Sequence, residues 1–195
     1  MQLNALILIG GKSTRMGVDK SSIQYRDKTH RAYLGDLLAE LGCEKVYFSC
    51  SKVQSKMVDL EYPILVDHYD NVGPIGGVLT AFEYLPDTAW LVVGCDYALL
   101  DQELLQTLIG NRRQDLEATV FRHPKSQLLE PLVSIYEAKA FPKIKAAFQN
   151  KQRSLRRILE TLEINGLDLK APHKLLNVNT PQEKENALKH LENRL

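Results

Sequence analysis

The sequence predicts a three-layer α/β/α fold of the Rossmann-like type with a mostly parallel sheet. Three observations predict it. Apolar segments of strand length alternate with segments of helical periodicity, a continuous apolar run lies at residues 90–94, and an early apolar run ends abruptly in glycines. Each connection between parallel strands has to cover one face of the sheet, so helices are expected on both faces. With 195 residues, the chain is expected to form a single domain over residues 1–195.

The composition excludes some classes of partner. The 25 basic and 24 acidic residues nearly cancel, so the overall field gives no reason to expect a nucleic acid or a membrane surface as partner. The first apolar run is too short to span a bilayer. The three cysteines form neither a CxxC pair nor a disulfide framework, which fits a reducing compartment and a cytoplasmic location. They are expected to be structural thiols.

The first half of the chain contains one complete strand, loop and helix unit. Residues 3–9 are rich in leucine and isoleucine, as in a buried parallel strand. Leu34, Leu37, Leu38 and Leu41 then form one apolar helical face, and Gly42 stands where a left-handed residue would end the helix. Residues 45–49 and 63–66 are expected to be the second and third strands.

The middle of the chain begins with a loop. Residues 67–77 contain three glycines and a proline, so they are not expected to be regular throughout. A helical face follows and ends before Pro86, and residues 90–94 then form a central strand. Asp101 is expected to cap the next helix.

The second half of the chain predicts further strands and helices. Strands are expected at residues 117–121 and 132–136, and helices at residues 139–148 and 154–162. Thr180-Pro181-Gln182-Glu183 combines a capping threonine, a proline at the first helical position and a glutamate three residues on. The terminal helix is therefore expected to begin there.

A glycine-rich basic loop follows the first strand. Residues 10–20 contain three glycines together with Lys12, Arg15 and Lys20. Glycines let backbone N–H groups approach phosphates, and the cations neutralise their charge. The loop is not a P-loop, because the glycine required five residues before Gly11 is replaced by Leu6, and the G-x-G-x-x-G spacing is also absent.

Asp96 is the candidate metal ligand. It follows the apolar run after a single residue, Cys95, so its carboxylate should emerge at the carboxyl edge of the sheet, where ligands bind in such folds. Mg²⁺ bound to nucleotide phosphates takes only one or two oxygen ligands from the protein. His30, His68 and His123 are not assigned as a general base.

With these motifs in place, the sequence resembles the molybdenum cofactor guanylyltransferases. Four blocks carry the resemblance, at residues 10–20, 73–77, 95–96 and 177–181, in the family's order and spacing. The resemblance implies a Mg²⁺-dependent nucleotidyltransferase that moves GMP from GTP to molybdopterin and releases pyrophosphate. It also implies transient contact with molybdenum-insertion or molybdoenzyme-maturation proteins.

The resemblance further implies roles for individual residues. Arg15, Lys20 and Asp96 would be catalytic, with Asp96 on the metal. The implied nucleotide-binding residues are Leu8, Ile9, Gly10, Gly11, Lys20, Ser49, Asp67 and Asp96, with Asp67 in the guanosine site. The implied pterin-binding residues are Gly76, Glu130, Pro131, Arg156, Asn177 and Asn179. For Arg156 the alternative is a solvated helix face, and for Asn177 and Asn179 it is organisation of the following helix.

Some positions depart from the family pattern. The glycine loop is a residue shorter than in some members, Ser49 replaces a frequent asparagine, and Ala98 replaces the proline that commonly follows the metal aspartate. Three alternatives therefore stay open. They are a molybdopterin cytidylyltransferase, a sugar-1-phosphate nucleotidyltransferase and a nucleotide-binding regulator without turnover. Gly10-Gly11, where many cytidylyltransferases have Ala-Gly, favours guanine.

Overall fold

The computed structural model describes residues 2–9, 23–56, 61–178 and 180–192. Its centre is one seven-stranded sheet with the strand order β3-β2-β1-β4-β6-β5-β7. Six strands run in one direction and β6 runs in the other, as its antiparallel pairing with β4 and β5 shows. The prediction of a mostly parallel sheet is confirmed. The strands are β1 (Leu3–Leu8), β2 (Val46–Cys50), β3 (Ile64–Val66), β4 (Ala89–Gly94), β5 (Ala118–Arg122), β6 (Leu129–Tyr136) and β7 (Ile164–Asp168).

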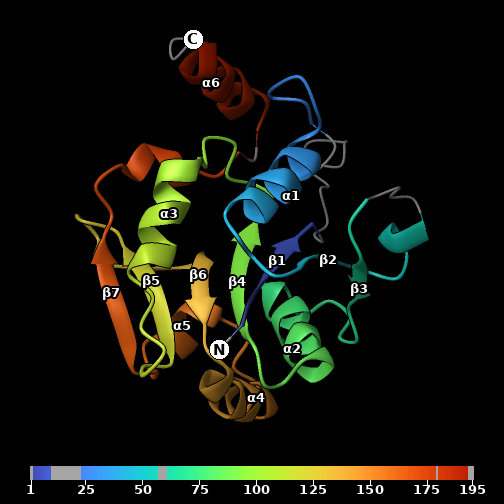
Figure 1. Ribbon diagram of the computed structural model, residues 1–195, viewed down its shortest axis with the longest axis vertical. Coiled ribbons are helices and arrows are strands. Elements are labelled where there is room, and N and C mark those ends of the chain that lie inside the picture. Colours follow the sequence, from blue (N-terminus) through green and yellow to red (C-terminus); the bar gives the residue numbers. More distant parts are fainter. Residues whose placement is uncertain (1, 10–22, 57–60, 179, 193–195) are drawn as a thin grey trace.

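Helices cover both faces of the sheet, which confirms the three-layer prediction (Figure 1). On one face, α1 (His30–Glu40) and α3 (Gln102–Gly110) pack against alternate residues of the central strands. On the other face lie α2 (Pro74–Tyr84), α4 (Phe141–Gln149) and α5 (Leu155–Leu159). Because successive side chains of a strand point to opposite faces, β1 and β4 contribute to both cores and are buried throughout most of their length.

The terminal helix α6 (Pro181–Glu192) lies apart from these two layers. A small apolar cluster attaches it, with Ala187 of α6 packing beside Tyr25, Leu99 and Val178. The predicted capping box is present. The Glu183 N–H donates to Thr180 Oγ1 at 3.2 Å, and the Thr180 N–H donates to Glu183 Oε2 at 2.9 Å.

Most element boundaries agree with the sequence to within a few residues, and several local signals are confirmed. Asp101 caps α3 by accepting from the Leu104 N–H, and Gly42 adopts φ +82° beyond the end of α1. The glycine segment at residues 67–77 was expected to be irregular in part, and its last residues belong to α2, which begins at Pro74.

Two elements differ more. Strand β6 begins at Leu129 instead of residue 132. The last pair between β6 and β4 is Val133 with Val93, so Pro131 lies beyond the part of β6 that pairs with β4. At that position the missing N–H of the proline costs no hydrogen bond. Strand β7 was not expected at all.

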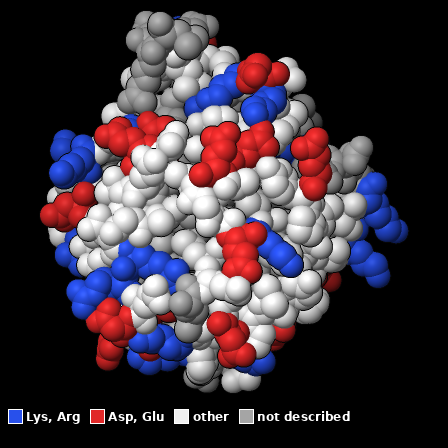
Figure 2. All heavy atoms as spheres, in the orientation of Figure 1, with Lys and Arg blue, Asp and Glu red and all other residues white. Residues whose placement is uncertain are grey.

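Among the described residues, no helix is both long and apolar enough to cross a membrane. Figure 2 shows acidic and basic side chains interspersed on the face in view, in keeping with the nearly neutral composition.

Candidate active site

The site lies at the carboxyl edge of the parallel strands. Leu8 at the end of β1 pairs with Ser49 of β2 on one side and with Gly94 of β4 on the other. Asp67 follows β3, and Asp96 follows β4 by two residues. The register of the sheet therefore sets the predicted residues Leu8, Ser49, Asp67 and Asp96 along one edge. Ile9 continues this edge and is held by its N–H, which donates to the Ser49 carbonyl at 3.0 Å.

Ser49 and Asp67 form a hydrogen-bonded pair. The Ser49 hydroxyl, which is 1% exposed, donates to Asp67 Oδ1 at 2.5 Å. The Asp67 N–H donates to the Cys50 carbonyl at 2.9 Å, which fixes the backbone beside the pair. Burial raises the pKa of the Asp67 carboxyl, while the bond from Ser49 opposes that rise. The pair presents a partly buried carboxylate that is fixed in one orientation, which suits recognition of N–H donors on a ligand.

The first turn of α2 packs directly against this pair. Gly73 precedes the helix with φ +77°, and Pro74 occupies one of the first helical positions. A Cβ on Gly77 would lie 2.2 Å from Ser49 Oγ and 2.7 Å from Leu8 Cδ2. Only glycine allows this approach. Gly76, predicted to contact the pterin, is buried in the same turn, and its Cα faces Val72 and Tyr69.

The turn that carries Asp96 is held from two directions. Asp96 accepts at its backbone carbonyl from the Val178 N–H at 2.9 Å. A Cβ on Gly94 would lie 2.9 Å from Asp96 Oδ1, so the carboxylate folds back over the end of β4. Burial, followed by the proximity of Cys95 and Asp96, raises the pKa of Tyr25 to about 12. Tyr25 is therefore a neutral neighbour of this carboxylate at physiological pH.

The antiparallel strand β6 brings a second group to the same edge. Tyr97 donates its hydroxyl to Glu130 Oε1 at 2.6 Å, and the Leu132 N–H donates to the same oxygen at 3.1 Å. His123 Nε2 lies 3.4 Å from Glu130 Oε2. The Glu130 carboxylate, predicted to contact the pterin, is therefore engaged within the protein.

The remaining predicted pterin contacts are placed differently. Arg156 is partly buried and donates from Nε to the Leu129 carbonyl at 2.9 Å, next to the half-exposed Pro131. Arg156 thus reaches the start of β6, whereas Arg153 of the same basic run stacks on Phe148. Asn177 is exposed and directly precedes Val178, which contacts the Asp96 turn.

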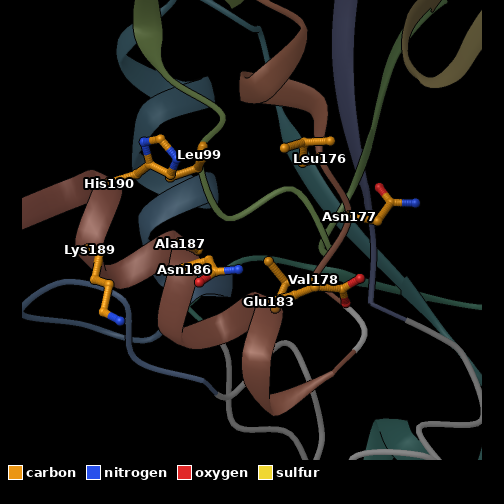
Figure 3. Close-up of a pocket in the computed structure, with 9 residues that line it drawn as sticks. All are labelled: Leu99, Leu176, Asn177, Val178, Glu183, Asn186, Ala187, Lys189 and His190. Atoms are coloured by element: carbon orange, nitrogen blue, oxygen red, sulfur yellow. The ribbon is translucent and has the colours of Figure 1, made fainter.

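A cavity of about 420 Å³ lies beneath α6. Its apolar lining comes from Leu99, Leu176, Val178 and Ala187, with polar groups of α6 around it (Figure 3). In this view the side chain of Asn177 projects to the side away from α6. Val178 lines the cavity and also bonds Asp96, so the cavity borders the back of the Asp96 turn.

Five of the predicted site residues lie outside the described part of the chain. They are Gly10, Gly11, Arg15, Lys20 and Asn179. Two residues that the sequence did not indicate join the site, namely Tyr97 and Tyr25. The position of Tyr97, directly after Asp96, was the available signal.

The sheet order and the carboxylates at one edge define a nucleotidyltransferase-type fold. Solved structures with the same fold include molybdopterin-guanine dinucleotide biosynthesis protein A from Archaeoglobus fulgidus, at a TM-score of 0.80 and 20% identity over 97% of this chain and 99% of that one. A CMP-2-keto-3-deoxy-manno-octonic acid synthetase complexed with CTP matches at a TM-score of 0.76 and 11% identity, over all of both chains.

The chain belongs to the family of the MobA-like NTP transferase domain, whose model matches residues 5–166, and it is a nucleotidyltransferase. A probable molybdenum cofactor guanylyltransferase of Flavobacterium johnsoniae is 31% identical over 94% of this chain and 88% of its own length. A molybdenum cofactor biosynthesis bifunctional protein of Synechocystis is 41% identical over 69% of this chain. The matched part spans only 39% of that longer protein.

Proposed function

We propose that this protein is a molybdenum cofactor guanylyltransferase, which transfers GMP from GTP to the terminal phosphate of molybdopterin. One observation carries the proposal. Leu8 of β1 pairs with Ser49 of β2 on one side and with Gly94 of β4 on the other. The Ser49–Asp67 pair and Asp96 therefore lie on either side of Leu8, where the glycine-rich basic sequence begins. Family membership and the names of the relatives support the same reaction. Residues 1–195 would act as one catalytic domain.

The nucleotide would bind across β1. Residues 8–11 would line it, and the fixed Asp67 carboxylate would accept hydrogen bonds from the guanine N–H groups. Cytosine presents no such adjacent pair of N–H donors, so the geometry of Asp67 favours GTP. Arg15 and Lys20 would neutralise the phosphates.

Asp96 would hold the metal ion, for which we propose Mg²⁺. The residue fits this role, because its carboxylate is a hard oxygen donor at the strand edge and its backbone is fixed by Val178. When bound, Mg²⁺ would offset the charge that develops on the triphosphate.

The acceptor would approach from the side of β6. Pro131 and Arg156 are the proposed contacts on that side, with Arg156 suited to an anionic phosphate. Gly76, Asn177 and Asn179 are also proposed to contact the acceptor. An oxygen of the molybdopterin phosphate attacks the α-phosphorus of GTP, the bond to the oxygen bridging to the β-phosphate breaks, and pyrophosphate leaves. The attacking oxygen is already ionised, so the protein aligns the two phosphates and needs no general base.

Pyrophosphate release from each NTP, with Mg²⁺ and molybdopterin present, tests this function. Release with GTP alone is expected. Preference for CTP would move the protein to the cytidylyltransferases, turnover with a sugar 1-phosphate as acceptor would move it to the sugar nucleotidyltransferases, and binding without release would make it a regulator.

Asp96→Ala should lower turnover by at least about 100-fold, since it removes the proposed protein ligand of the metal. The matched control is Asp87→Ala, which removes an exposed carboxylate just before the opposite end of the same strand and should keep wild-type turnover. Circular dichroism would establish that both variants are folded. Undiminished Mg²⁺-dependent turnover in Asp96→Ala would remove this residue from its proposed role.

A further inference from the structure

A buried hydrogen bond joins the Asp96 turn to β6. The Tyr97 hydroxyl donates to Glu130 Oε1 at 2.6 Å, and the two residues are 2% and 5% exposed. They are 33 positions apart in the sequence. The bond therefore fixes the segment after β4 to the neighbouring antiparallel strand, at the edge where the substrates are proposed to meet.

Both oxygens of Glu130 are engaged within the protein. Oε1 accepts from Tyr97 and from the Leu132 N–H, and Oε2 faces the His123 ring at 3.4 Å. A buried carboxylate is stable only when such donors replace its water, and removing one of them is costly. Glu130 is therefore arranged to hold neighbouring protein groups and not to present a free carboxylate to a ligand.

Because Tyr97 is held by its hydrogen bond to Glu130, it also restricts the neighbouring Asp96. The two residues are adjacent, and both lie against Gly94, where a Cβ would be 2.9 Å from Asp96 Oδ1 and 3.1 Å from Tyr97 Cε2. The Asp96 backbone is fixed on its other side by Val178. A rotation of the Tyr97 ring would therefore disturb the space into which the Asp96 carboxylate folds.

We propose that Tyr97 and Glu130 are positioning residues that fix the orientation of the Asp96 carboxylate for the metal ion. This inference rests on the proposed function, in which Asp96 holds the metal. It replaces direct contact with the pterin as the role of Glu130. Hydrogen-bonding groups that orient metal ligands typically change metal affinity by about 10- to 100-fold when they are removed.

The test measures Mn²⁺ binding by the electron paramagnetic resonance signal of free Mn²⁺, with the protein in excess over GTP and the binding by GTP alone subtracted. Tyr97→Phe keeps the ring and removes only the hydroxyl, so the dissociation constant for Mn²⁺ should rise by about tenfold. Steady-state turnover should show the same rise in the half-saturating Mg²⁺ concentration, with a smaller change in the KM for GTP at saturating Mg²⁺.

The matched control is Tyr136→Phe. Tyr136 is also fully buried, lies on β6 and donates its hydroxyl to a backbone carbonyl, that of Pro131, at 2.9 Å. The two variants should lose similar stability in thermal unfolding, but Tyr136→Phe should keep the wild-type Mn²⁺ affinity. If both variants weaken Mn²⁺ binding equally, the effect is a general loss of packing and the inference is overturned.

Glu130→Gln separates positioning from substrate contact. The amide oxygen can still accept from Tyr97 and Leu132, so Mn²⁺ affinity should stay within about threefold of wild type, whereas Glu130→Ala should match Tyr97→Phe. A Glu130→Gln enzyme with normal Mn²⁺ binding and a raised KM for molybdopterin would restore the pterin-contact role and overturn the inference.

Comparison of the wild type with Asp96→Ala separates failure of the proposed metal site from failure of the positioning role. If Asp96→Ala binds Mn²⁺ with GTP as tightly as the wild type, the proposed metal site is wrong. If Asp96→Ala loses binding while Tyr97→Phe behaves like Tyr136→Phe, only the positioning role is wrong.

Discussion

At the scale of single residues, the sequence indicated where side chains lie along the sheet but not which of them bond to one another. Ser49, Asp67 and Asp96 were predicted as site residues, and the structure places all three along one sheet edge. That Ser49 donates to Asp67 was not predictable, because the bond joins two strands whose register is a property of the whole sheet. For the same reason the sequence showed Glu130 only as a motif residue and not as the partner of Tyr97.

The pair of Ser49 and Asp67 gives a prediction at this scale. Ser49→Ala removes the hydrogen bond that opposes the effect of burial, so the pKa of the Asp67 carboxyl should rise further. A carboxyl with a higher pKa loses its charge at a higher pH as the solution is acidified. If ionised Asp67 binds guanine, the variant should bind GTP about fivefold more weakly, roughly one hydrogen bond, with a larger loss at pH 5.5 than at pH 8.

Calorimetric titration with GTP at the two pH values measures this effect. Ser55→Ala is the control, because its exposed hydroxyl bonds only locally, to the Lys52 carbonyl. Equal losses at both pH values would mean that the ionisation of Asp67 does not control GTP binding.

At the scale of elements, periodicity and capping signals were sufficient where local sequence decides the structure. The capping box of α6 and the Asp101 cap of α3 are both confirmed. Strand β7 was missed because its Asn165-Gly166 pair is typical of a turn. In the structure this glycine lies beneath the Arg122 side chain of the paired strand β5, and a Cβ there would lie 2.8 Å from Arg122 Nη2.

The packing of α2 against the sheet gives a prediction at the scale of elements. Gly77→Ala would set a methyl group 2.2 Å from Ser49 Oγ, so α2 or the Ser49 side chain has to move. We expect a loss of about 1–3 kcal/mol in the free energy of unfolding and weaker GTP binding. Chemical denaturation and GTP titration measure the two effects.

Gly110→Ala is the matched control for Gly77→Ala. It also lies in a helix, α3, but a Cβ there would meet nothing within 4 Å. This substitution should be neutral or stabilise by up to about 1 kcal/mol. Equal destabilisation by both substitutions would show that the contact of α2 with Ser49 is not the cause.

At the scale of the whole molecule, the layer architecture follows from the alternation of strands and helices, and the sequence predicted it correctly. The sequence did not indicate that β6 would run antiparallel to the other six strands. The direction of a strand depends on which neighbours it pairs with, and these pairings join segments far apart in the chain. The phosphate-binding cations Arg15 and Lys20 stay predictions, since they lie outside the described residues.

The stability of the whole protein should depend on a buried histidine. Burial, and secondarily the Arg26 guanidinium, lower the pKa of His30 from 6.5 to about 3. The folded protein therefore keeps His30 neutral at pH values where the unfolded chain protonates it, so acidification below pH 6.5 favours unfolding. Between pH 7.5 and pH 5 this group should cost about 2 kcal/mol of stability.

Urea denaturation of wild type and His30→Gln across this pH range measures that contribution. The variant should lose less stability on acidification by about the same amount. A His30→Gln variant with an unchanged pH dependence would show that other groups cause the acid sensitivity.

The reversed direction of β6 has a consequence for how such an enzyme diversifies. Arg122 at the end of β5 pairs with Leu129 at the start of β6, so the hairpin tip between them, with residues 124–128 exposed, projects at the same rim as Asp96. This tip lies outside the strands β1, β2 and β3, at whose ends the nucleotide is proposed to bind. Insertions or exchanges there would leave the strand register of the proposed GTP site intact, so we expect this hairpin to be the place where acceptor choice can be altered.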